Sequence, residues 1–194
     1  MIKKIVLREV DRIIKETWKK DISSDYWHDY LDKEDTLKCD LYYHLRRKLK
    51  RILKENNLRI FTEYFFSVTR YKADIVIVEL DPYMEYDYLQ QAVVNIVALF
   101  ELKFTSSSND RTADWVKNDL WKFKDYHSIE GLETTQFYSG TIYEIDCDYL
   151  TWLDARSTNN WANGRVTELV SGKIDGKMKF EVHSYNGMNK GLND

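Results

Sequence analysis

Apolar residues recur at helical spacing in two early segments of the chain. The first segment predicts a helix over residues 3–19, and the acidic, aromatic stretch that follows is expected to form a loop or a short helix. The second segment, residues 34–55, has the stronger pattern, because its apolar residues recur every three or four positions: Leu37, Leu41, Leu45, Leu49 and Ile52. A long amphipathic helix is therefore predicted there.

The middle of the chain changes to short apolar runs typical of strands. The predicted strands cover residues 58–68, 73–80, 92–104 and 137–146. The run over 92–104 is apolar at successive positions, which indicates a strand covered on both faces. Between the last two strands, Val116, Leu120, Phe123 and His127 have the spacing of a helix over 112–127.

Turn signals divide the C-terminal part. Asp175-Gly176 separates two strand-like segments, which predicts a C-terminal β-hairpin over residues 165–184. A short helix is expected within 147–155. The whole pattern predicts an α/β (α+β) fold with a central mixed sheet flanked by helices. One domain over 1–194 is expected, with a core at about 34–146 and the helix 3–19 and the hairpin as additions.

Composition narrows the class of protein without identifying it. The 194 residues are 43% hydrophobic with a net charge of −3, so nucleic-acid binding would need a local basic patch. Cys39 and Cys147 form no CxxC motif and the four histidines are scattered, which disfavours a structural zinc site or a disulfide scaffold. The charged N-terminus and the lack of a long apolar run predict a cytoplasmic protein without a membrane partner.

The stretch "FELKF" ends the most apolar strand with two charges. Glu101 and Lys103 are two residues apart and therefore share one face of a strand. Asp74 lies near the start of the preceding predicted strand. Carboxylates and the Leu102 carbonyl are the hard oxygen ligands that Mg²⁺ prefers. Taken alone, the Glu-x-Lys pattern is more typical of an ion pair at a strand end.

A further carboxylate belongs to the long predicted helix. At about 100° per residue, Glu34 falls near the centre of the apolar stripe. A carboxylate in that position is unfavourable unless it is paired or bound to a metal. Its place at the start of the helix also suits a cap or the helix dipole. Both interpretations stay open.

The order of these motifs over residues 34–126 resembles the PD-(D/E)xK phosphodiesterase superfamily, which has the restriction-endonuclease-like fold. Asp74 falls on the aspartate of the second strand, Glu101-Leu102-Lys103 on the (D/E)xK motif, and Glu34 on the acid of the first helix. Ala73 stands in place of the proline. The resemblance implies Mg²⁺, replaceable by Mn²⁺, held by Asp74, Glu101, Leu102 and Glu34, with Lys103 beside the attacking water.

The implied function is a metal-dependent endonuclease that hydrolyses nucleic acid, with DNA favoured over RNA. Lys117 and Lys122 are expected to contact substrate phosphates, and the basic run that contains Arg46 and Arg47 is a second candidate contact. A solvated helix face explains these charges equally well. The alternatives are a non-catalytic nuclease-fold module that binds nucleic acid or a protein, and an interaction protein with an aromatic dimer surface. If the protein recognises a specific nucleotide sequence, we expect it to act as a homodimer or with a partner subunit.

Overall fold

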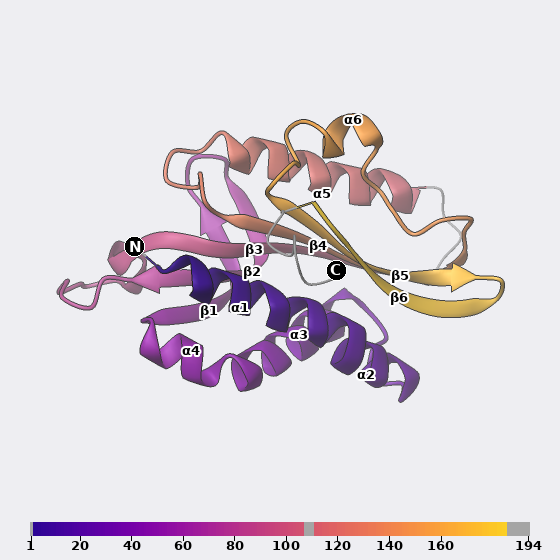
Figure 1. Cartoon of the computed structure of the whole chain (residues 1–194), viewed down its shortest axis with the longest axis horizontal. Helices are drawn as coiled ribbons and strands as arrows, with labels where there is room; N and C mark the ends of the chain where they lie inside the picture. The colour runs from indigo at the N-terminus through magenta and orange to yellow at the C-terminus, as the bar shows by residue number, and fades with distance from the viewer. Residues whose placement is uncertain (1, 107–110, 186–194) are drawn as a thin grey trace.

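The computed structural model describes residues 2–106 and 111–185, which form a six-stranded mixed sheet flanked by helices (Figure 1). The strands are β1 (Leu58–Phe66), β2 (Tyr71–Leu80), β3 (Val93–Thr105), β4 (Gln136–Asp146), β5 (Val166–Ile174) and β6 (Lys177–Ser184). The helical segments are α1 (Lys4–Glu16), the π-helix η1 (Thr17–Ile22), α2 (Ser23–Trp27), α3 (Glu34–Lys48), α4 (Lys50–Glu55), the 3₁₀ turn η2 (Leu89–Ala92), α5 (Arg111–His127) and α6 (Ala155–Thr158). The predicted mixed α/β class is confirmed.

Strand order in the sheet follows chain order. The strands β1, β2 and β3 are antiparallel neighbours, β4 and β5 run parallel to β3, and β6 closes the sheet as an antiparallel hairpin with β5. The hairpin turns at Asp175 (φ 53°) and Gly176 (φ 70°), the pair of positive φ angles of a type I′ turn. The predicted C-terminal hairpin is therefore confirmed.

Two apolar cores lie on opposite faces of the sheet. On one face α1, η1, α3 and α4 cover one core, and on the other α5 and the connection that carries α6 cover the second (Figure 1). Strand β3 separates the two, because Phe100 and Leu102 enter the first core and Leu99 enters the second. By the same alternation, Glu101 and Lys103 point to the α5 side.

Several predicted boundaries need correction. The first helical stretch continues past residue 19 through η1 into α2, because Trp18 and Ile22 extend its buried face. The long helix is interrupted at Leu49, which separates α3 from α4. The short helix expected within 147–155 is wrong; α6 begins only at Ala155. In the last turn of α5, Tyr126 is buried, whereas His127, which was predicted to face the core, is exposed.

Candidate functional site

The candidate site lies where β2 and β3 separate. Their pairing ends at Ile75 and Phe100. Asp74, the next residue of β2, replaces the missing ladder bond: its Oδ2 accepts a hydrogen bond from the Leu102 amide at 2.7 Å. The predicted carboxylate of β2 is thereby fixed against the Glu101-Leu102-Lys103 segment of β3. Leu102 itself points its side chain into the helical core, where it is fully buried.

Glu101 is buried beneath α5 with only 3% of its surface exposed. Its Oε2 accepts from Lys122 Nζ at 3.1 Å and its Oε1 accepts from the Tyr126 hydroxyl at 3.3 Å. Lys122 and Tyr126 are one helical turn apart on α5, so both reach the same carboxylate. A buried carboxylate requires such partners, because an unpaired charge in an apolar core is strongly unfavourable.

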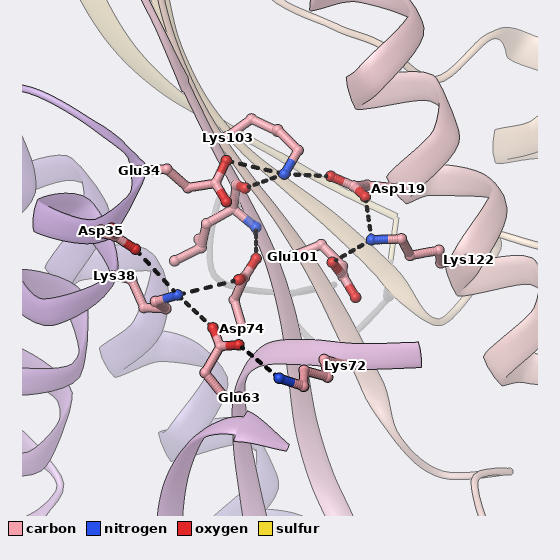
Figure 2. Close-up of polar contacts among 11 residues, drawn as sticks. Glu34, Asp35, Lys38, Glu63, Lys72, Asp74, Glu101, Lys103, Asp119 and Lys122 are labelled. Atoms are coloured by element: carbon pink, nitrogen blue, oxygen red, sulfur yellow. Dashed lines mark hydrogen bonds and ion pairs between the residues drawn. The ribbon is translucent and has the colours of Figure 1, made fainter. Parts of the chain in front are cut away.

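Lys103 connects three elements at the end of the strand. Its ammonium lies 3.0 Å from Glu34 Oε2 on α3 and 3.2 Å from Asp119 Oδ2 on α5, and it donates to the Leu102 carbonyl at 3.1 Å (Figure 2). Asp119 also binds Lys122 through Oδ1 at 2.6 Å. The two lysines and the two helices are thus joined through Asp119, a residue that sequence reasoning missed.

A third lysine occupies the β1 side of the site. Lys38, one turn after Glu34 on α3, binds Glu63 and lies 3.7 Å from Asp74 Oδ1. Glu63 falls opposite Asp74 in the strand register, because its neighbours pair with Ile75 and Ala73. Its φ of 54° is unusual for a residue with a side chain. Two like charges on adjacent strands repel, so Lys38 is needed between them.

The charges of this group, called the strand-end site, do not cancel. Five carboxylates face three lysines, which leaves two negative charges in excess when all are ionised; the carboxylates are Glu34, Glu63, Asp74, Glu101 and Asp119, and the lysines are Lys38, Lys103 and Lys122. At the rim, the exposed Asp35 and Lys72 add one charge of each sign. An excess of two negative charges suits one divalent cation.

Burial changes the protonation of the site. It raises the pKa of Glu101 to about 8; Lys122 opposes the rise, and the Asp119 and Asp74 charges add to it. Burial also raises the pKa of Asp74, against the hydrogen bond from the Leu102 amide. For Lys103, burial disfavours the charged form, but Asp119 and Glu34 outweigh it and raise the pKa. Lys103 is therefore a permanent cation at neutral pH.

The donor set fits a hard divalent cation in its chemistry and charge. Asp74 is fixed to the Leu102 amide, the residue between Glu101 and Lys103, so carboxylate and carbonyl oxygens belong to one short segment of two strands. Asp119 Oδ2 is buried with no hydrogen bond and is held only by its ion contact with Lys103. The spacing is wider than in a closed site. Among the described residues, three ligand atoms come within 4.8 Å of one another only at Asp25, Asp40 and His44. At the strand ends, ammonium groups stand between the carboxylates.

A cavity gives access to the strand-end site. It has a volume of about 330 Å³ and is lined by Glu34, Lys103, Phe104, Thr105, Trp115, Asn118 and Asp119. Trp115 is half exposed at its edge. The cavity thus joins the Lys103 ammonium to solvent between α3 and α5.

The four basic residues predicted to contact substrate lie at different distances from the strand-end site. Lys122 is part of it. Lys117 is exposed on α5 and lines a separate cleft with Tyr149 and Trp152. Arg46 and Arg47 are exposed near the far end of α3, about 18 Å along the helix axis from Glu34 at 1.5 Å per residue. The structure therefore gathers Glu34, Asp74, Glu101, Leu102, Lys103 and Lys122, and leaves Lys117, Arg46 and Arg47 outside.

Comparison with known proteins identifies no relative. No protein-family model, no curated protein and no solved structure matches the chain. Within residues 2–106 and 111–185, no helix has both the length and the apolar character needed to cross a membrane.

Proposed function

We propose that the protein is a divalent-metal-dependent phosphodiesterase that cuts nucleic acid, preferably DNA, with a core of the restriction-endonuclease-like type. The observation that carries this proposal is the hydrogen bond from the Leu102 amide to Asp74. This hydrogen bond fixes Asp74 of β2 against the segment of β3 that carries Glu101, the Leu102 carbonyl and Lys103. The resemblance of these same residues to the PD-(D/E)xK motif supports the same chemistry.

Each residue has a defined task in this proposal. Asp74, Glu101 and the Leu102 carbonyl would hold the cation, with Glu34 at the edge of its water shell. A bound Mg²⁺ or Mn²⁺ supplies a Lewis acid for the scissile phosphate and lowers the pKa of a coordinated water. Lys103, a permanent cation that donates several hydrogen bonds, orients the attacking water and offsets the negative charge that develops on the phosphate.

The lysine contacts favour a second candidate. Lys38, Lys103 and Lys122 already pair with the carboxylates without a metal. A non-catalytic module of the same fold, which binds nucleic acid or a protein partner, requires no more than this.

A cleavage assay separates the two. The purified chain is incubated with supercoiled, linear and single-stranded DNA and with RNA, in Mg²⁺, Mn²⁺ or EDTA. The proposal predicts cleavage that requires the metal and is lost in Asp74→Asn and Glu101→Gln, while Glu130→Gln, an exposed carboxylate elsewhere, keeps wild-type activity. The non-catalytic module would be supported instead if no substrate is cleaved and if nucleic-acid binding is unchanged by EDTA and by Lys103→Ala.

A further inference from the structure

A second group of metal-binding side chains lies away from the strand ends, where η1 and α2 pack along α3 (Figure 1). Asp21 and Asp25 come from the first two segments. Asp40 and His44 come from α3, one turn apart, so their side chains share a face. These four residues are called the helical cluster. Among the residues that the structure describes, no ion pair or hydrogen bond joins these four to the strand-end site.

The helical cluster already has the compactness of a metal site. His44 Nε2 lies 2.6 Å from Asp25 Oδ2 and 3.6 Å from Asp40 Oδ1. The ligand atoms of Asp25, Asp40 and His44 all lie within 4.8 Å of one another. Around a tetrahedral zinc ion, ligand atoms at 2.0–2.2 Å from the metal stand about 3.4 Å apart. Small side-chain rotations therefore bring these three atoms to ligand spacing.

A separate observation points to a missing partner. Asp40 Oδ2 is buried and has no hydrogen-bond partner. The Asp40 and Asp25 carboxylates meet at one atom, His44 Nε2, which lies 3.6 Å from Asp40 Oδ1 and 2.6 Å from Asp25 Oδ2. Two carboxyl groups that meet in this way need a shared proton or a cation between them. A buried acceptor without a donor is costly and is satisfied by a cation.

The orientation of His44 is that of a metal ligand. The ring is buried, with Nε2 directed to the Asp25 and Asp40 carboxylates. Its Nδ1 lies 3.4 Å from the Arg47 guanidinium and 3.6 Å from Asp21 Oδ1. Histidine ligands commonly have a carboxylate on the ring nitrogen opposite the metal, which fixes the tautomer. Asp21 pairs with both Lys48 and Arg47, so its charge is compensated by these cations and not by the proposed metal. Asp25 and Asp40 then leave two negative charges for a dication.

We propose that Asp25, Asp40 and His44 form a zinc site that fastens the N-terminal helical segment to α3. One imidazole and two carboxylates with water as the fourth ligand make a tetrahedral set, and the nitrogen donor favours Zn²⁺ over Mg²⁺ or Ca²⁺. The π-helix η1 is the segment that carries Asp21 into this arrangement, and π-helical turns are frequent at functional sites. This inference does not rest on the proposed nuclease function.

Zinc titration of the full chain tests it. Chelator-treated protein in the Glu101→Gln background is titrated with ZnSO₄ in a calorimeter, so that the strand-end site does not contribute a second binding event. We expect one zinc ion per chain, bound with micromolar or tighter affinity. Asp40→Asn and Asp25→Asn should each weaken binding by about 100-fold or more, and Asp21→Asn, outside the first ligands, by about 10-fold. Far-UV circular dichroism confirms that each variant is folded.

The control is Glu55→Gln, an exposed carboxylate at the end of α4, which should bind zinc as its parent does. Two results would overturn the proposal. One is the absence of zinc binding tighter than millimolar in the parent. The other is binding that persists unchanged in both Asp25→Asn and Asp40→Asn, since the zinc would then lie elsewhere. Neither result bears on DNA cleavage, which is measured separately with Asp74→Asn.

Discussion

The two carboxylate groups along α3 solve the problem of crowded negative charge in different ways. At the strand-end site, lysines alternate with carboxylates, so that Lys38 and Lys103 each bridge two acids. In the helical cluster, Lys48 and Arg47 pair with Asp21, whereas Asp25 and Asp40 face His44 directly, and Asp40 Oδ2 has no hydrogen-bond partner. The first arrangement can exchange a cation without losing all its partners, as a catalytic centre requires. The second is suited to a cation that stays.

The surroundings of the two groups differ in the same sense. The strand-end site opens into a cavity through Glu34 and Lys103. The helical cluster lies between packed helices, and His44 is buried there. Access to solvent therefore favours turnover at the first site and retention at the second.

The largest expected effect is on the rate of DNA cleavage, which should depend on Lys103 of the strand-end site and not on His44 of the helical cluster. Under the proposed function, Lys103→Met should lower the rate of DNA cleavage by about 10³-fold, because it removes the ammonium that is proposed to orient the attacking water. Lys124→Met, an exposed lysine on α5, is the matched control. His44→Gln should leave the rate per folded molecule within about twofold and lower only zinc affinity. Single-turnover kinetics on folded protein measure both, and an equal loss in Lys103→Met and His44→Gln would contradict the comparison.

The next effect concerns the pH dependence that Glu101 gives to the strand-end site. Glu101 has a folded pKa of about 8 against an ordinary value of 4.5. Between these values the folded state keeps a proton that the unfolded state releases, so the contribution of Glu101 to stability is fully present below pH 4.5 and is lost as the pH rises to about 8. One such proton changes the free energy of unfolding by at most ~1.4 kcal/mol per pH unit. Urea unfolding of EDTA-treated protein at several pH values measures the slope.

The Glu101→Gln variant is the reference for this measurement. It cannot titrate, so its unfolding free energy should lose this component of the slope between pH 4.5 and 8. If the parent and Glu101→Gln have parallel pH profiles, Glu101 is ionised in the folded metal-free protein, and Lys122 outweighs burial.

A smaller effect tests how firmly the core supports the strand ends. A Cβ added at Gly140 on β4 would lie 2.5 Å from Leu102 Cδ2 and 3.5 Å from Trp18 Cζ3. Gly140→Ala should therefore lower the free energy of unfolding by about 1–3 kcal/mol. It should also reduce the proposed cleavage to the extent that relief of the clash moves the Leu102 backbone, whose amide holds Asp74. Unfolding in urea and the cleavage rate are measured together.

A double variant identifies the cause. Leu102→Val shortens the side chain in the clash, so Gly140→Ala combined with Leu102→Val should be more stable than the sum of the two single losses predicts. Additive losses would show that the clash is relieved in another way.

The comparison also explains what the sequence can predict. Alternation along β3 is enough to predict that Glu101 and Lys103 share a face, and the structure confirms it, because both side chains pair with residues of α5. This is a local property of one strand. Asp119 had a detectable signal, because it lies between Val116, Leu120 and Phe123 on the buried face of α5. A carboxylate at that position needs a partner, as Glu34 does.

The remaining parts depend on how distant segments pack. Lys38 and Glu63 meet only because α3 crosses the ends of β1 and β2. The helical cluster requires η1 to continue the first helix, and no residue pattern over 17–22 predicts π-helical geometry there. His44 was counted among scattered histidines, because its partner Asp25 is nineteen positions earlier in a predicted loop.

The smallest expected effect concerns the neutral partner of Glu101. The Tyr126 hydroxyl donates to Glu101 Oε1 at 3.3 Å, a long hydrogen bond to a carboxyl that also has Lys122. Tyr126→Phe keeps the ring packed against Phe66 and Phe137 and removes only the hydroxyl, so the loss of unfolding free energy should be about 1 kcal/mol or less. The helical cluster should be unaffected, with zinc affinity equal to that of the parent. A loss above about 3 kcal/mol in urea unfolding would mean that the hydroxyl, and not Lys122, is the main partner of the buried carboxyl.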